Sequence, residues 1–314
     1  MSINATTTTP LSLDQGARLL AAAWGLDSAT LLAARALLEA ELLEQPRFGL
    51  DLLDEFATDA QVRLGADADA ALSWLDASRS FAPRALADAA LELARRTRTL
   101  GVALTWLRGV RGFGRLAPFV RSIADQGQVA FACAHSMPFV APHGGLRAVI
   151  GTNPWALAAG KGAHQLVIDT ATAAATMAQL RAARRDGLAL DPGVAIDTNG
   201  QATTVADAVA ALLPRGGTTG SLAGLLVEVL AGVLSGGRGD DQGRGVLLLS
   251  LDAEQSPAGA QGTWQETLEE LGRQWGKAGG HWPQGQPLDG NTPLGPRQLE
   301  RLHAALNKLA RRNP

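Results

Sequence analysis

Hydrophobic positions recur at helical spacing along most of the first hundred residues. Ser12 stands three residues before Gln15, a spacing suited to a reciprocal N-terminal cap, and a second helix is predicted to begin directly after Asp27. A third helix is predicted over residues 83–98, where Pro83 lies in the first turn and its missing N–H costs no hydrogen bond. The front of the chain is therefore predicted to be a helical unit.

Beyond Gly101 the chain changes to short apolar runs separated by glycine-rich turns. Strands are predicted over residues 102–107, 129–134, 165–168 and 246–251. Helices are predicted over residues 116–125, 172–185, 221–234 and 263–275, with a last helix that ends at Arg311. This order indicates a mixed α and β protein with a helical front end.

Composition and charge narrow the class of protein. The chain has 314 residues, 46% of them hydrophobic and 18% charged, which is typical of a globular protein with a sizeable core. The net charge of −2 predicts no nucleic-acid partner. The longest apolar helix candidate, residues 222–234, contains Glu228 and is shorter than the roughly 20 residues that span a bilayer, so no membrane partner is expected. The first residues lack a signal-peptide pattern, so we expect a cytoplasmic location.

The number and spacing of the cysteine and histidine residues predict neither an internal disulfide nor a metal site. Cys133 is the only cysteine and lies in an apolar run, so a buried, inert thiol is expected and an internal disulfide is excluded. His135, His143 and His164 lack the spacing of metal ligands on one element, and no metal is expected.

Residues 135–172 hold the most informative pattern. Two turns, Gly151-Thr152-Asn153-Pro154 and Asp169-Thr170-Ala171-Thr172, offer backbone N–H and hydroxyl groups that can surround a phosphate-bearing cofactor. Gly112-Phe113-Gly114 follows a predicted strand but lacks the third glycine and the downstream acid of a Rossmann fingerprint, which disfavours that fold. The nucleophile elbow Gly-x-Ser-x-Gly is absent too.

The order and spacing of these pieces resemble the malate/L-lactate dehydrogenase-like reductases, a family that includes ureidoglycolate dehydrogenase and the Δ1-piperideine-2-carboxylate reductases. The pieces are Pro142 with Gly144 and Gly145, and residues 151–154, 169–172, 193–197 and 213–220. The resemblance implies a mixed α/β fold that is not a Rossmann domain, with a mainly antiparallel sheet flanked by helices. It also implies NADPH or NADH as cofactor, a small-molecule substrate, and a homodimer with each cofactor site near the subunit interface.

The same resemblance implies how the chain is divided and which residues meet the cofactor. We expect an α/β cofactor-binding domain over residues 101–251, and helical parts over residues 1–100 and 252–314 that pack together. The expected cofactor contacts are Gly112, Phe113, Gly114, Thr152, Asn153, Pro154, Asp169, Thr170, Thr172, Thr218, Thr219 and Gly220.

Several departures from the family pattern fall at its active site. Phe48 stands at the position of the family's acid-donating His, and phenylalanine cannot transfer a proton. Arg47 replaces the Ser of the same motif, and Leu52 replaces its Arg. Gly112 replaces a second His, and Thr219 replaces a Lys. The active site is therefore expected to be rebuilt.

Asp169, which the family pairs with the missing His, is retained as a catalytic candidate, although an Asp that caps the following helix fits the sequence equally well. His135, just beyond a predicted strand, either takes over proton transfer or is a hydrogen-bonded structural residue.

Arg47 and Phe48 are the expected substrate-binding residues. The planar fork of donors on Arg47 suits a substrate carboxylate; alternatively, Arg47 faces solvent at the end of the second helix.

Two functions remain open. One is an NAD(P)H-dependent reductase of a small cyclic imine or 2-oxo acid; a cyclic iminium arrives protonated and needs no His acid, which favours the imine. The other is a repurposed non-redox biosynthetic enzyme, or a non-catalytic partner subunit, on the same fold. Malate, lactate and ureidoglycolate are not expected to be turned over, because Phe48 supplies no base.

Overall fold

The computed structural model describes residues 11–56, 63–64, 70–237, 243–284 and 288–312. The helices are α1 (Leu13–Ala22), α2 (Ser28–Leu42), α3 (Asp51–Phe56), α4 (Ala82–Leu100), α5 (Ala117–Ala124), α6 (Met177–Asp186), α7 (Thr218–Val227), α8 (Pro257–Ala260), α9 (Trp264–Lys277) and α10 (Pro296–Arg312). The strands are β1 (Arg63–Leu64), β2 (Leu72–Asp76), β3 (Val102–Val110), β4 (Gln128–Ala134), β5 (Pro154–Ala159), β6 (Leu166–Ala171), β7 (Ala195–Ile196), β8 (Ala211–Leu212) and β9 (Arg244–Asp252).

Short helical turns connect these elements. The 3₁₀ turns are η1 (Pro46–Phe48), η2 (Gly162–His164), η3 (Ala206–Ala208), η5 (Val233–Ser235) and η6 (Ala253–Gln255). Between α7 and η5 the helix widens into a π turn, η4 (Glu228–Gly232). The predicted cap is confirmed at α1, where Ser12 and Gln15 hydrogen-bond each other's backbone N–H groups, and Asp27 caps α2 as its position predicted.

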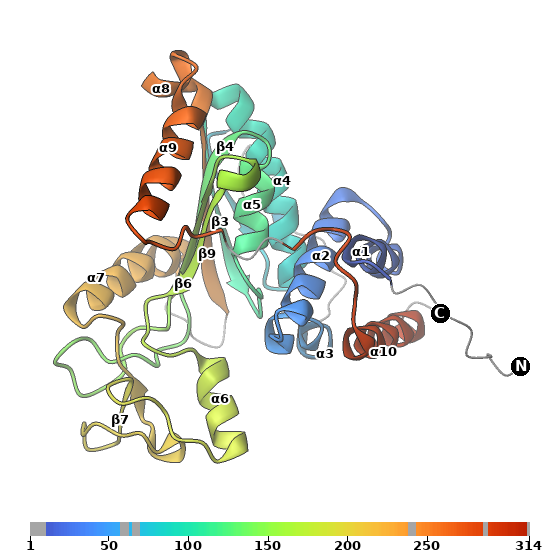
Figure 1. Ribbon diagram of the computed structural model, residues 1–314. Coiled ribbons are helices and arrows are strands. Elements are labelled where there is room, and N and C mark those ends of the chain that lie inside the picture. Colours follow the sequence, from blue (N-terminus) through green and yellow to red (C-terminus); the bar gives the residue numbers. More distant parts are fainter. Residues whose placement is uncertain (1–10, 57–62, 65–69, 238–242, 285–287, 313–314) are drawn as a thin grey trace, which may run out of the picture.

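The sheet has seven strands in the order β1-β2-β3-β9-β4-β5-β6. β2 and β3 are parallel, and every other pair in this sheet is antiparallel. Helices lie on both faces, with α4 and α5 on one and α7 and α9 on the other (Figure 1). The expected fold class, a mixed α/β protein with a mainly antiparallel sheet flanked by helices, is confirmed.

The two faces of the sheet carry side chains of different size. The face under α4 and α5 is lined by small residues, so the helices approach closely. These residues are Ala103, Ala130, Ala132, Ala134, Ala156 and Ala158, all buried. The opposite face carries Trp106, Phe131 and Trp155 around Cys133, and the short stretch from α7 to η5 packs on its centre. One face is therefore sealed and the other is partly open.

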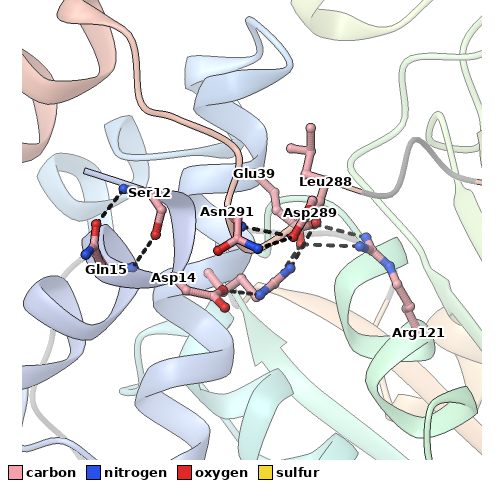
Figure 2. A network of polar contacts seen from close by, with 9 residues as sticks. Ser12, Asp14, Gln15, Glu39, Arg121, Leu288, Asp289 and Asn291 are labelled. Atoms are coloured by element: carbon pink, nitrogen blue, oxygen red, sulfur yellow. Dashed lines mark hydrogen bonds and ion pairs between the residues drawn. The ribbon is translucent and has the colours of Figure 1, made fainter. Parts of the chain in front are cut away.

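A second core joins α1, α2 and α10 into a helical unit beside the sheet (Figure 1). Arg35 forms an ion pair with Asp14 and donates to the Leu288 carbonyl at 3.0 Å. Glu39 accepts from Arg121 of α5 at 2.9 Å, so a buried ion pair ties the helical unit to the helix that covers the sheet (Figure 2).

Part of the chain before residue 100 joins the sheet. β2 pairs with β3 inside the sheet, and α4 packs on the sheet rather than with α1 and α10. The reason lies in Leu72-Ser73-Trp74-Leu75, where exposed and buried residues alternate as in a strand. The helical unit is therefore built from α1, α2 and α10.

One helical stretch, Thr218–Ser235, is long and apolar enough to cross a membrane by length and composition, with a mean hydropathy of 1.5 and 33% of its residues buried. The sequence predicts a shorter helix here, but α7 continues through η4 and η5 without a break. A single stretch of this kind is weak evidence for a membrane protein, because a core or interface helix has the same composition.

Candidate active site

The two turns that the sequence singles out lie side by side, because β5 begins in one and β6 ends in the other. Pro154 pairs with Ala171 in register. The backbone N–H and the hydroxyl of Thr172 both donate to the carbonyl of Thr152, each at 3.1 Å. Arg215, shortly before α7, donates its N–H to the Thr172 carbonyl at 2.8 Å. The structure therefore brings three of the family's motif pieces together.

Asn153 holds its turn against α7. Its φ of 39° lies in the left-handed region, which asparagine tolerates better than most residues. Its side-chain oxygen accepts from the Ser136 N–H at 3.1 Å, and its amide donates to the Gly224 carbonyl and to Glu228, both at 2.9 Å. Asn153 is fully buried, so its amide shapes the turn and has no group left for a cofactor.

The N-terminal turn of α7 keeps its polar groups exposed. Thr218 and Thr219 are exposed. The N-cap residue is Gly217, which has no side chain to cap the helix. Gly220 is required by packing, since an added Cβ would lie 2.0 Å from the Arg215 carbonyl oxygen. Free N–H groups at a helix N-terminus suit an anionic group. Nearby, the His143 N–H donates to Ser221 at 2.7 Å, which brings the Pro142 turn to the same place.

A second group of residues gathers at the N-terminus of α5. Gly114 has a φ of 77°, and a Cβ added there would lie 3.0 Å from the Phe48 carbonyl oxygen and 3.5 Å from Leu52. The segment Gly112-Phe113-Gly114 therefore lies directly against η1, the turn that carries Phe48.

Asp169 points from β6 toward this group. Its register partner Ala156 faces α5, and its Oδ2 accepts from the Ala117 N–H of α5 at 3.1 Å. Burial raises the pKa of the Asp169 carboxyl, and the nearby Arg115 guanidinium partly offsets that rise. Asp169 thus supports the N-terminus of α5 and at the same time lies at the candidate site, whereas the sequence suggested a cap on the helix that follows it.

Sequence reasoning missed Arg115. Its Nε lies 3.8 Å from Asp169 Oδ2, its side chain is 12% exposed, and it makes no hydrogen bond to any described residue. The sequence held no signal for it, because Arg115 precedes Leu116, the N-cap residue of α5, and so lies outside the first turn of that helix.

His135 lies on the other face of the sheet from Asp169. Alternate residues of a strand face the same side, so His135 lies on the face of Phe131 and Cys133. It packs there against Gly232 of η4. It has no exposed surface, and its Nδ1 accepts from the Gly245 N–H at 2.8 Å. Burial lowers its pKa, and Glu228 opposes that shift. The structure therefore does not bring the two catalytic candidates together, and it favours the structural alternative for His135.

Arg47 lies in η1 with its side chain 54% exposed and its Nε 3.8 Å from Asp51. This geometry favours the solvent-facing alternative. Among the described residues, no group of three His, Cys, Asp or Glu side chains is placed to hold a metal ion. A cavity of about 790 Å³ between α9 and the sheet is lined by Val129 and Ala159, away from the motif residues.

Comparisons with known proteins agree with this arrangement. A family model described as malate/L-lactate dehydrogenase matches residues 29–262. The Δ(1)-pyrroline-2-carboxylate/Δ(1)-piperideine-2-carboxylate reductase of Pseudomonas syringae pv. tomato is 39% identical over 175 residues, 54% of this chain and 51% of that protein. The malate dehydrogenase of Pyrococcus abyssi is 34% identical over 158 residues, 47% of this chain and 43% of that protein. These alignments span about half the length of the curated relatives.

Solved structures match over nearly the whole chain. The Δ1-piperideine-2-carboxylate reductase from Pseudomonas syringae has a TM-score of 0.78 at 28% identity, covering 95% of this chain and 100% of that one. A dehydrogenase from Sinorhizobium meliloti has a TM-score of 0.72 at 27% identity, covering 95% and 93%. The resemblance expected from the motifs is confirmed: the chain belongs to the malate/L-lactate dehydrogenase family.

Proposed function

We propose that the chain is an NAD(P)H-dependent reductase of a small cyclic imine that carries a carboxylate. The observation that carries the proposal is Phe48, which lies beside Gly114 where the family pattern has its proton-donating His. A ketone needs that proton as it becomes an alcohol, whereas a cyclic iminium already holds one on nitrogen. The names of two relatives, reductases of Δ1-pyrroline- and Δ1-piperideine-2-carboxylate, support the choice of an imine.

The chain's own residues fit a nicotinamide dinucleotide. The exposed first turn of α7, with Thr218 and Thr219, offers free N–H and hydroxyl groups to a diphosphate. Asn153 and Thr172 fix the shape of the two turns beside it. A bound nicotinamide would supply a hydride to the imine carbon, with a saturated cyclic amine and the oxidised cofactor as products.

The proposal includes a homodimer. The stretch from α7 to η5 turns a row of apolar side chains away from the sheet, and each is 43–62% exposed. They are Leu222, Leu225, Leu226, Val229, Val233 and Leu234. Val102 and Leu251, on the partly open sheet, are 42% and 43% exposed. Monomeric proteins rarely expose apolar surface in such continuity, and a second copy of the chain, as the resemblance implies, is the occupant we propose.

Calorimetric titration of the purified chain with NADH and with NADPH tests the proposal. Saturable binding of at least one is expected; absence of binding at millimolar cofactor would instead support the non-redox alternative. Malate, lactate and ureidoglycolate should not be oxidised at a useful rate. General base catalysis raises the rate of such a reaction by about 10²–10⁴-fold, and Phe48 supplies no base. Efficient oxidation of any of the three would show that another residue acts as the base.

A further inference from the structure

The charged pair at the N-terminus of α5 has unused hydrogen-bonding capacity. Arg115 and Asp169 lie 3.8 Å apart, which is longer than a hydrogen bond. Nη1 of Arg115 is buried and has no partner among the described residues. Asp169 accepts a hydrogen bond from the Ala117 N–H of α5. A buried guanidinium donor without an acceptor is costly, so it points to a ligand group that would accept from it.

Arg115 lies close to a position where the resemblance implies a positive charge. The family pattern puts an Arg where this chain has Leu52, and Leu52 lies 3.5 Å from the position of a Cβ on Gly114. Arg115 is the next residue after Gly114. The side chains of Arg115 and Asp169 are 12% and 16% exposed, so neither is completely closed off from solvent.

We propose that Arg115 and Asp169 together recognise a zwitterionic substrate: Arg115 binds its carboxylate, and Asp169 accepts the hydrogen bond of its protonated ring nitrogen. This inference rests on the proposed function. In an imine-2-carboxylate the nitrogen and the carboxyl group are attached to the same carbon, so its two charges are neighbours, as Arg115 and Asp169 are.

The pair accounts for selectivity between substrates. A 2-oxo acid offers the carboxylate but no N–H, so it would place a carbonyl oxygen against the Asp169 carboxylate. Arginine presents a planar fork that binds a carboxylate through two parallel hydrogen bonds, whereas lysine offers a single point charge. Arg115 is therefore assigned as a specificity-determining residue, with Asp169 as its counterpart for the nitrogen.

Two imines separate the two roles. Δ1-Piperideine-2-carboxylate has both charged groups, and Δ1-piperideine has the ring nitrogen alone. With NADPH, Arg115→Gln should lower kcat/KM for the first by about 10²-fold, mainly through KM, and leave the second within about 3-fold. Arg115→Lys should recover part of the loss. Asp169→Asn, which can still accept from the Ala117 N–H, should lower kcat/KM for both imines.

Controls keep this inference distinct from the proposed function. Arg95→Gln removes the same charge from the exposed surface of α4 and should leave kcat/KM unchanged for both imines. Calorimetry with pyridine-2-carboxylate, an unreactive ring carboxylate, should show weaker binding to Arg115→Gln than to the native chain even if no imine is reduced. Equal losses for both imines in Arg115→Gln, or a carboxylate-specific loss in Arg47→Gln instead, would overturn the assignment. Failure of the native chain to bind either NADPH or NADH would overturn only the proposed function.

Discussion

The polar side chains on the two faces of the sheet differ in charge and in exposure. On the partly open face, Asn153 and Glu228 hydrogen-bond each other, and His135, which is completely buried, accepts from the Gly245 N–H while its Nε2 has no partner among the described residues. At the end of the sealed face, Arg115 and Asp169 carry opposite charges, are 12% and 16% exposed, and leave the buried Nη1 of Arg115 without an acceptor in the described part of the chain. A buried donor on a charged group costs more to leave unpaired than one on a neutral ring. Charge and partial exposure therefore separate the candidate site from the completely buried His135.

The largest expected effect tests the packing of the sealed face. Phe119 of α5 is completely buried there, and Phe119→Ala should lower the free energy of unfolding by about 3–5 kcal/mol. Leu251 of β9 lies on the other face and is 43% exposed in the single chain, so Leu251→Ala should cost less than about 1 kcal/mol when the protein is diluted to the monomer. Urea denaturation at matched protein concentration measures both. Equal costs would contradict the contrast between the faces.

The next prediction concerns what covers the partly open face. Leu225 of α7 is 52% exposed in the single chain, and Leu225→Asp would place a charge at an apolar interface twice, once from each copy. The dimer dissociation constant should rise by about 10²-fold or more, as measured by sedimentation. Leu26→Asp, at an equally exposed position between α1 and α2, is the control. A native chain that sediments as a monomer would remove the homodimer from the proposal.

The smallest effect is a pH dependence that originates at His135. Because burial lowers its pKa from the ordinary value of 6.5, the unfolded chain binds the proton more readily than the folded one. Its contribution to stability is complete above pH 6.5 and is lost as the pH falls toward the folded pKa. The free energy of unfolding should fall by less than about 1.4 kcal/mol per pH unit there.

His135→Gln should flatten this slope, while His303→Gln, at an exposed position on α10, should keep it. Denaturant titrations between neutral and mildly acidic pH measure the difference. An unchanged slope in His135→Gln would place the responsible group elsewhere.

Local patterns were enough to predict most regular elements. The alternation and flanking glycines of residues 102–107 and 246–251 predicted two central strands, observed as β3 and β9. β5 was missed, because Trp155-Ala156-Leu157-Ala158 also fits a helix and becomes a strand through its pairing with β4 and β6. Tertiary pairing overrides local propensity there.

The candidate site was only partly predictable. The order of the motifs predicted that the two turns and the start of α7 would meet. Each of these motifs lies at one end of a strand or at the start of a helix. The face of the sheet on which a side chain lies depends on the strand register, and a shift of one residue moves the side chain to the other face. His135 and Asp169 therefore looked alike in the sequence, and Arg115 became visible only through its distance to Asp169.

The central claim is that this site reduces a protonated imine that carries a carboxylate. The most direct measurement follows oxidation of NADPH, and separately of NADH, by the native chain with Δ1-piperideine-2-carboxylate or with pyruvate. The account predicts that the imine is consumed in step with the cofactor and that pyruvate reacts at least about 10²-fold more slowly, since Phe48 donates no proton to the carbonyl oxygen. Comparable rates for the two compounds, or no cofactor oxidation with either, would contradict it.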